Sequence, residues 1–232
     1  MKNTLIRVII PAFNEEASIG LVVNDIPDFV EEVIVVSNNS TDQTEAVAKE
    51  KGAKVLKEGR RGYGYACLKG MDYISENNLS TDVIVFLDGD YSDYPEEMTK
   101  IVEPILNDGY DMVIGARVKH LRETGAMTFP QIFGNWLATT LMKILYGAKY
   151  TDLGPFRAIK YNQLLALNME DKTYGWTVEM QLKALKNKLK YTEVEVNYRN
   201  RIGDSKVSGT VKGAFMAGLK ILGWIFKYAI KK

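Results

Sequence analysis

The sequence predicts an α/β fold in which helices cover both faces of a mainly parallel central sheet. Short runs of β-branched and aromatic apolar residues alternate with helical patterns over residues 1–117, and the connections between them are short. With 232 residues and 46% hydrophobic content, the chain is also long and apolar enough to bury a substantial core. We expect right-handed connections between the parallel strands.

The first half contains five expected strands, and a helical pattern follows each of the first four. The strand at residues 83–87 is the clearest, because VIVFL has no polar residue and so resembles a strand buried on both faces. Acidic residues after Asn14 favour a helix start, since the helix dipole stabilises negative charge there. The expected strands are residues 5–10, 33–36, 53–56, 83–87 and 112–114, and the expected helices are residues 14–24, a segment around 45–48, a segment ending near 75, and 96–106.

The second half has a different character. Residues 124–142 carry no formal charge, but Pro130, Gln131, Gly134 and Asn135 interrupt the run, so it is a poor candidate for a membrane span. A helix that lies on an apolar surface is the better interpretation. The expected elements are a helix at residues 133–146, a turn and strand at 151–160, an amphipathic helix at 176–189 and a last strand at 193–198.

The C-terminal segment, residues 211–232, has the pattern of a basic amphipathic helix. Its longest charge-free run, residues 221–226, is too short to span a bilayer, so we expect the helix to lie on a membrane surface. The alternative is a terminal helix that packs on its own domain. At about 100° per residue, the lysines fall in one arc and the apolar residues lie opposite: Lys212, Lys220, Lys227 and Lys231 against Val211, Ala214, Phe215, Leu222, Ile225 and Ala229.

The overall composition excludes several classes of protein. The net charge is +1, so bulk charge gives no indication of nucleic acid binding. Cys67 is the single cysteine, which rules out an internal disulfide and fits a reducing compartment. The apolar N-terminal stretch is too short for a signal peptide, so we expect the catalytic part to face the cytosol. No G-x-G-x-x-G follows the first strand, which argues against dinucleotide binding.

The segment Asp88-Gly89-Asp90 ends the clearest strand of the predicted sheet. Ligands of open α/β sheets bind at the carboxyl ends of the strands. Two carboxylates held this close repel each other unless a cation lies between them, and glycine lets an anionic group approach the backbone. A hard divalent ion, Mg²⁺ or Mn²⁺, is the expected occupant, with its other ligands supplied by phosphate and water.

Polar groups also follow the other strands at the same predicted edge. They occur in residues 11–15, 37–39 and 60–62. These segments offer groups for a base and ribose, and a basic residue for a phosphate. Together with Asp88 and Asp90 they predict a site for a nucleoside diphosphate.

The chain resembles the family 2 glycosyltransferases of the GT-A fold, and among them the dolichyl- and polyprenyl-phosphate hexose synthases. The similarity covers nearly the whole chain, with the motifs in family order. It implies a GT-A catalytic domain over residues 1–205, divided into a nucleotide-sugar-binding half (1–117) and an acceptor-binding half (118–205), followed by a membrane-surface helix (206–232). The matching segments are VIIPAFNEE, VSNNSTDQT, GRRGYGYA, FLDGDYSDYPEE, GAR at 115–117, FGNWL, TDLGPFRAI and RIGDSK.

The resemblance also implies site residues. Asp88 and Asp90 would hold the metal and the diphosphate, Asp90 and Arg117 would act in catalysis, and transfer would invert the anomeric centre. One departure is Ser37-Asn38, where the family usually has Asp-Asp, so the preference for uracil or guanine cannot be carried over. The implied nucleotide-sugar residues are Pro11, Phe13, Glu15, Val36, Asn38, Arg61, Asp88, Gly89 and Asp90.

The acceptor determines which further residues are needed. A hydroxyl acceptor needs a carboxylate base, for which Glu179 and Asp152 are the candidates. A phosphate acceptor is already ionised and needs positioning instead, for which guanidinium groups are suited. The expected residues for binding that phosphate are Arg117, Arg199, Arg201 and Lys206.

The expected activity is metal-dependent transfer of a hexose from UDP-glucose or GDP-mannose to polyprenyl or dolichyl phosphate at the cytosolic face of a membrane. The enzyme would be peripheral, with a membrane-protein partner as a further hypothesis. One alternative is a family 2 transferase with a saccharide acceptor. Another is a non-catalytic protein that binds nucleotide sugars.

Overall fold

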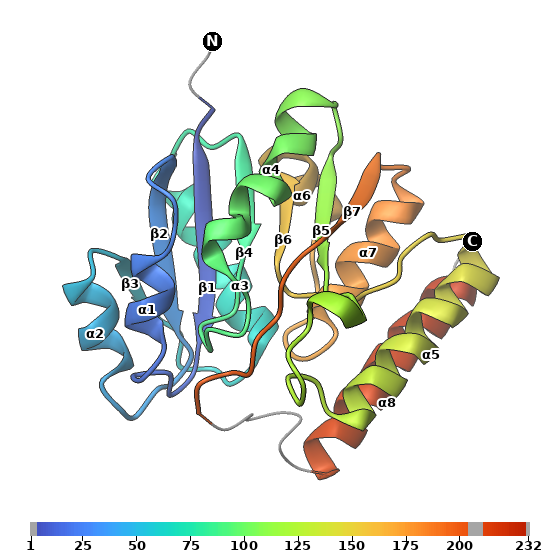
Figure 1. The fold of residues 1–232 in the computed structure, drawn as a ribbon. Coiled ribbons are helices and arrows are strands. Elements are labelled where there is room, and N and C mark those ends of the chain that lie inside the picture. Colours follow the sequence, from blue (N-terminus) through green and yellow to red (C-terminus); the bar gives the residue numbers. More distant parts are fainter. Residues whose placement is uncertain (1–3, 204–210, 231–232) are drawn as a thin grey trace.

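The computed structural model describes residues 4–203 and 211–230, and its centre is a seven-stranded sheet (Figure 1). The strand order across the sheet is β3-β2-β1-β4-β6-β5-β7. The strands are β1 (Ile6–Ala12), β2 (Val30–Ser37), β3 (Lys54–Lys57), β4 (Val83–Phe86), β5 (Met112–Ala116), β6 (Arg157–Lys160) and β7 (Tyr191–Glu195).

All strand pairs are parallel except the two made by β6, which runs antiparallel to β4 and to β5. The mainly parallel sheet expected from the sequence is therefore confirmed. Strand β6 comes from the second half of the chain, yet it lies between two strands of the first half. The carboxyl ends of β1, β2, β4 and β5 consequently share one edge of the sheet.

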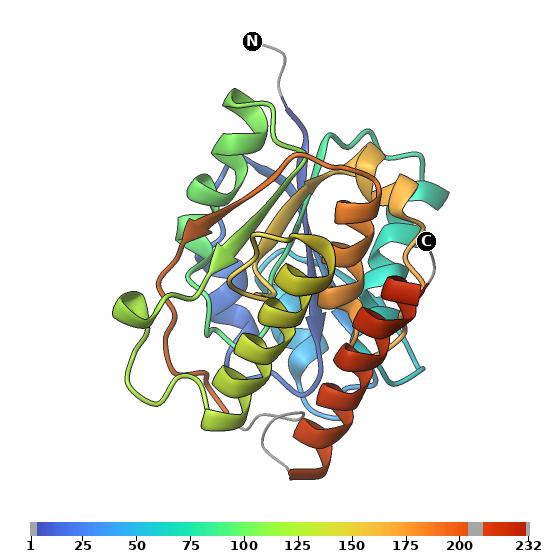
Figure 2. The same cartoon turned by 90° about the vertical axis from the view of Figure 1, so that its right-hand side faces the viewer.

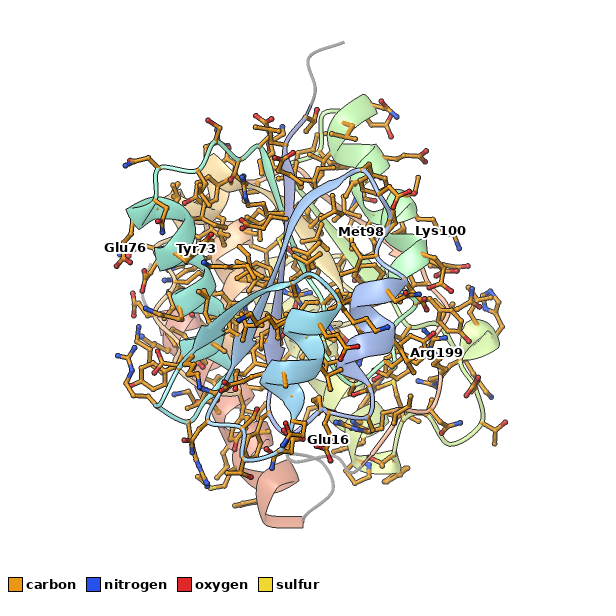
Figure 3. The ribbon with its side chains drawn as sticks, turned by 90° about the vertical axis from the view of Figure 1, so that its left-hand side faces the viewer. Glu16, Tyr73, Glu76, Met98, Lys100 and Arg199 are labelled. Atoms are coloured by element: carbon orange, nitrogen blue, oxygen red, sulfur yellow. The ribbon has the colours of Figure 1, made fainter. Side chains whose placement is uncertain are left out.

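Helices cover both faces of the sheet, as predicted. Helices α1 (Ile19–Asn24), α2 (Thr44–Glu50) and α4 (Met98–Asn107) lie on one face, and α3 (Tyr63–Glu76), α5 (Phe129–Tyr146), α6 (Tyr161–Leu167), α7 (Trp176–Lys186) and α8 (Val211–Ile230) lie on the other. Figure 3 shows this division, with Tyr73 and Glu76 of α3 on one flank and Met98 and Lys100 of α4 on the other. Short 3-10 turns occupy Pro95–Glu97 and Lys119–Leu121.

The core consists of two apolar clusters, one on each face of the sheet. Ile9 and Phe86 face the cluster under α3, whereas Val8 and Val85 face the cluster under α1 and α4. Successive strand residues point to opposite faces, so a strand buried on both sides must be apolar throughout. This explains the uninterrupted run VIVF of β4, all of which is buried.

Several element boundaries differ from the prediction and helix α6 was not predicted; three of the boundary differences are the most informative. The helix expected from residue 14 begins at Ile19, because Asn14 has a φ of +53°, which no α-helix accommodates. Helix α5 begins four residues before the predicted start at 133, where Thr128 and Gln131 form a capping box. The last strand lies at Tyr191–Glu195 rather than at 193–198, in parallel register with β5.

Helices α5 and α8 lie side by side (Figures 1 and 2), and α8 also packs on α7. Trp224 and Ile225 of α8 are buried in the core, while Phe215 and Phe226 are exposed. Of the predicted arc of lysines, Lys220 and Lys227 are exposed beside these apolar side chains, whereas Lys231 and the side chain of Lys212 lie outside the described part of the chain. None of the helices within residues 4–203 and 211–230 is both long and apolar enough to cross a membrane.

Candidate active site

A pocket of about 560 Å³ opens at the carboxyl edge of the sheet and extends between α5 and α8. Its walls come from both halves of the chain. Most of the residues expected from the sequence to bind nucleotide sugar or phosphate line it: Pro11, Phe13, Glu15, Asn38, Arg61, Asp88, Gly89, Asp90, Arg117 and Arg201.

Asp88 and Asp90 follow β4 and present two carboxylates to this pocket. Asp88 accepts a hydrogen bond from the Tyr63 hydroxyl at 3.0 Å. Burial and the neighbouring Asp90 charge raise the pKa of Asp88 to about 6. Asp90 accepts hydrogen bonds from the Ser92 backbone N–H at 2.9 Å and the Ser92 hydroxyl at 2.6 Å.

This donor pair fits a hard divalent cation. Burial and the charge of Asp90 both disfavour the ionised form of Asp88, and a cation between the two carboxylates would stabilise it. Among the residues that the structure describes, no group of three or more His, Cys, Asp or Glu side chains forms a complete metal cage. Two protein carboxylates with phosphate and water completing the shell is the usual arrangement for Mg²⁺.

Arg201 lies beside Asp90 and connects the two halves of the chain. Its guanidinium group is 3.1 Å from an Asp90 carboxylate oxygen and 3.0 Å from a Glu15 carboxylate oxygen. The backbone N–H of Ile202 also donates to the Asp90 carbonyl at 3.0 Å. A fixed positive charge therefore stands next to the carboxylate pair, where an anionic phosphate would need it.

Arg117 also lines the pocket, and Asp152 behind it holds the guanidinium group in place. The Arg117 Nε and Nη2 donate to the two Asp152 oxygens at 2.8 and 2.6 Å, and the Arg117 backbone N–H donates at 2.8 Å. Burial opposes the charge of Asp152, but Arg117 outweighs it and lowers the pKa of that carboxyl below its usual value. Asp152 thus fixes the orientation of the Arg117 side chain, which lines the pocket.

Asn38 organises the loop that follows β3. Its side-chain nitrogen donates to the Arg60 carbonyl at 2.7 Å, and its side-chain oxygen accepts the Gly62 backbone N–H at 2.8 Å. Both ends of the amide are therefore engaged with the protein. Arg61, from the same loop, lies 5.8 Å from the centre of the Phe13 ring. The aromatic ring and the cation together frame the side of the pocket expected to receive the nucleotide.

The outer part of the pocket is narrow and mostly apolar. Gly134 and Asn135 of α5 face Ala217, Gly218 and Ile221 of α8 across it. A methyl group added at Gly134 or Gly218 would meet no atom within 4 Å. Small residues on two adjacent helices leave an open furrow that leads outward from the carboxylates.

The sequence model of glycosyl transferase family 2 matches residues 7–164. The chain belongs to this family.

Three relatives are similar over most of their length. An uncharacterised glycosyltransferase of Mycobacterium bovis is 30% identical over 94% of this chain and 96% of its own. The UDP-N-acetylglucosamine–dolichyl-phosphate N-acetylglucosaminyltransferase of Methanococcus voltae is 31% identical, over 84% of this chain and 86% of its own. The dolichyl-phosphate hexose transferase of Haloferax volcanii is 30% identical, over 90% of this chain and 89% of its own.

The fold of the chain is also found among solved structures. Glucosyl-3-phosphoglycerate synthase of Mycobacterium tuberculosis, crystallised with Mn²⁺, UDP and glucosyl-3-phosphoglycerate, superposes with a TM-score of 0.77 at 22% identity. The match covers 97% of this chain and 80% of that one. The GT-A fold expected from the sequence is therefore confirmed.

Of the described residues expected at the site of this family 2 glycosyltransferase, four do not line the pocket, namely Val36, Arg199, Asp152 and Glu179. Val36 is a buried strand residue. Arg199 stacks on Tyr91 and Tyr94 and donates to the Tyr91 carbonyl at 2.7 Å; Figure 3 shows its place on the flank of the molecule. Asp152 lies behind Arg117. Lys206 is outside the described residues.

Glu179 is the fourth residue away from the pocket, and it is fully buried in α7. Its carboxylate accepts the backbone N–H groups of Glu170 and Asp171 at 2.9 and 2.7 Å and pairs with Lys183 at 2.8 Å. All of these contacts are structural. Neither carboxylate expected to serve as a base therefore faces the pocket.

Sequence reasoning missed four aromatic residues that line the pocket, namely Tyr63, Tyr174, Trp176 and Tyr198. Tyr63 donates to Asp88, and Tyr174 lies in the loop before α7. The segment GRRGYGYA drew attention to its glycines and arginines, and no spacing rule indicated which tyrosine turns inward. The signal that could have identified Tyr63 is its position directly after the loop that follows β3, at the edge where ligands bind.

Proposed function

We propose that this chain is a metal-dependent, inverting hexosyltransferase that moves a sugar from a nucleotide sugar to polyprenyl or dolichyl phosphate. The observation that carries the proposal is a single pocket that joins the Asp88–Asp90 pair, three arginines and an apolar furrow. The names of the relatives from Methanococcus voltae and Haloferax volcanii, which specify dolichyl phosphate, support the acceptor class.

Asp88 and Asp90 would hold a Mg²⁺ or Mn²⁺ ion, whose contribution is to stabilise negative charge on the leaving diphosphate. Phe13, Arg61 and Gly62 would then enclose the nucleotide, since they line the adjacent wall. The bound Mn²⁺ and UDP of the structural neighbour support a donor of this type.

The acceptor argument depends on which carboxylates reach the pocket. Among the described residues, the only carboxylates that line it are Glu15, Asp88 and Asp90. Asp88 and Asp90 are assigned to the metal and Glu15 pairs with Arg201, so none is placed to deprotonate a hydroxyl. A phosphate monoester needs no such base, because it is already ionised near neutral pH. This favours a lipid phosphate over a saccharide, with Arg117 and Arg201 as its ligands.

The helices beside the furrow support a lipid-bound acceptor. Phe129 and Trp136 of α5 are 78% and 58% exposed, and Phe215 of α8 is 64% exposed. Exposed aromatics gathered on two adjacent helices are typical of a surface that contacts a membrane or partner. Residues 206–232 would then hold the enzyme on the cytosolic face, peripherally and, in a further hypothesis, beside a membrane-protein partner.

Transfer of radiolabel tests the function directly. UDP-glucose, UDP-N-acetylglucosamine and GDP-mannose would be incubated in parallel with polyprenyl phosphate in liposomes, with Mn²⁺ or EDTA. We expect organic-phase label only with metal, and at least about 100-fold less with Asp90→Asn. Asp111→Asn is the matched control, because Asp111 is a structural carboxylate bound to Lys160 and to the Lys190 backbone.

The other outcomes separate the alternatives. Donor hydrolysis or label in a water-soluble saccharide, without lipid product, would move the acceptor to a sugar. Donor binding without any turnover would favour a non-catalytic nucleotide-sugar-binding protein. Absence of donor binding would contradict the proposal as a whole.

A further inference from the structure

Asp171 lies in the loop between α6 and α7 and is buried, yet its carboxylate contacts donors from two elements. One oxygen accepts the backbone N–H groups of Thr173 and Gly175 at 2.6 and 3.0 Å. The other accepts the indole N–H of Trp224 at 2.5 Å and lies 3.2 Å from the Lys220 ammonium group. A single carboxylate therefore joins α8 to this loop.

The loop is in direct backbone contact with the start of α3. The Lys172 carbonyl accepts the Tyr65 N–H at 3.1 Å, and the Thr173 carbonyl accepts the Gly64 N–H at 3.3 Å. The first amides of a helix have no partner within the helix, so the loop satisfies two that would otherwise be free. The approach requires glycine, because a Cβ at Gly64 would lie 2.0 Å from the Asp171 carbonyl oxygen.

The start of α3 in turn reaches the carboxylate pair. Tyr63 donates its hydroxyl to Asp88, and Gly62 donates its N–H to Asn38 at 2.8 Å. Both residues line the pocket. Hydrogen bonds, joined by short covalent segments of backbone, thus connect α8 through Asp171 and the loop to Asp88.

Helix α8 presents three different surfaces along this path. Its outer face exposes Phe215 and Leu219, its pocket side carries Gly218 and Ile221, and Trp224 bonds to Asp171. Figure 2 shows that α8 lies at the surface along its described length, beside α5. A contact made at the outer face of α8 can therefore affect Asp88 through these hydrogen bonds.

We propose that Asp171 is a positioning residue that couples docking of α8 on an anionic lipid surface to binding of the nucleotide. Docking holds α8 in place, and through Asp171 it orders the 171–175 loop and the first turn of α3. Less conformational freedom is then lost when the nucleotide binds beside Asp88, so its affinity rises. The coupling rests on the proposed function, which assigns the nucleotide to this pocket and lipid to α8.

Amide hydrogen exchange tests the structural link without any ligand. Trp224→Phe removes the indole N–H and keeps an aromatic, although smaller, ring in the core. We expect the amides of Gly64 and Tyr65 to exchange at least about tenfold faster in Trp224→Phe and Asp171→Asn than in wild type. Asp111→Asn, which also removes a structural carboxylate, should leave both amides as in wild type. Unchanged exchange in Trp224→Phe would overturn the link, even if Asp171→Asn failed to fold.

Nucleotide affinity tests the coupling itself. UDP and GDP, each with Mn²⁺, would be titrated into the protein with and without vesicles of phosphatidylcholine containing phosphatidylglycerol. We expect vesicles to raise the wild-type affinity about tenfold, and nucleotide to raise vesicle affinity by the same factor, because such coupling is reciprocal. Trp224→Phe should reduce both factors, and Trp224→Phe with Lys220→Met, which removes both contacts of α8 with Asp171, should reduce them to about one.

The failures are distinguishable. Wild type that binds nucleotide equally well with and without vesicles would overturn the coupling while leaving the proposed function intact. Wild type that binds neither nucleotide would contradict the proposed function instead. Full coupling that persists in Trp224→Phe would remove Asp171 from the path.

Discussion

Asp93 is a buried carboxyl group near Asp88 and Asp90, and neither of its oxygens has a hydrogen-bond partner in the described structure. Burial, and next the charge of Asp88, raise the pKa of Asp93 well above its usual value. A raised carboxyl pKa means that folding disfavours ionisation. The stability cost is therefore absent below about pH 4 and grows as the pH rises through the folded-state pKa.

Asp93→Asn should consequently stabilise the fold at neutral pH. The amide has nearly the same shape but carries no charge to desolvate, so we expect a gain of about 1–3 kcal/mol near pH 7 and little change near pH 4. Urea denaturation at both pH values measures the difference. A loss of stability at neutral pH would mean that Asp93 has a cation partner in solution.

The Arg117–Asp152 pair should give the opposite dependence of folding stability on pH. Its lowered pKa makes Asp152 stabilising above about pH 4, with that contribution lost as the pH falls through the folded-state value. Asp152→Asn leaves Arg117 buried without its counter-charge, so we expect a loss of about 3–5 kcal/mol at neutral pH. Thermal or urea unfolding measures it, and an unchanged midpoint would contradict the importance of the pair.

The residues at strand ends were predictable, but the orientation of the remaining acids was not. Asp88 and Asp90 follow an apolar run, and such a run fixes both the strand and the edge at which it ends. Glu179 and Asp152 have the right chemistry for a base, yet one faces a loop backbone and the other faces Arg117. Those orientations depend on contacts between distant segments, which no local pattern encodes.

At the scale of elements, α5 and α8 together form an exposed aromatic surface. It is defined by Phe129, Phe133, Trp136, Phe215 and Phe226, all of which are exposed. Phe129, Phe133 and Trp136 form consecutive ring contacts along α5, with centroid distances of 6.3 and 5.8 Å. Neighbouring rings on one surface are suited to insert together at the interface of a bilayer.

Replacing two of these rings should weaken binding to vesicles. Burying one phenylalanine contributes about 1.5–3 kcal/mol, so Phe215→Ser with Phe226→Ser should lower vesicle affinity by at least about 100-fold. Phe29→Ser is the matched control, because Phe29 is similarly exposed on the loop before β2. Sedimentation with vesicles measures binding, and equal losses in both proteins would contradict a specific surface.

The expected elements match the structure where one periodicity dominates. Every strand predicted in the first half is present, because β4 and its neighbours are apolar on both faces. The predicted start of α1 was wrong because Asn14 adopts a left-handed conformation, which hydrogen bonds with Ser40 and Thr41 hold in place. The antiparallel direction of β6 also leaves no local signal, since it depends on which edges of β4 and β5 remain open.

At the scale of the whole molecule, ligand should stabilise the fold by mass action. Nucleotide and Mn²⁺ that bind only the native state contribute about 2.7 kcal/mol at 100 times the dissociation constant. For a chain of this size, that corresponds to a rise of about 5–10 °C in the melting temperature. EDTA should abolish the rise in wild type, and Asp90→Asn should show none. A rise that persists in EDTA would contradict a metal-bridged diphosphate.

Strand β6 has a consequence for the synthesis of the protein. Strand β4 ends at Phe86, but the partner for its open edge ends at Lys160. At about 5–20 residues per second, the ribosome needs several more seconds to add the intervening residues. During that time β1 and β4 can pair, while an apolar strand edge stays uncovered and available to other nascent chains. The protein is therefore most vulnerable to aggregation before its last third has been made, and slower translation over residues 87–156 would lengthen that exposure.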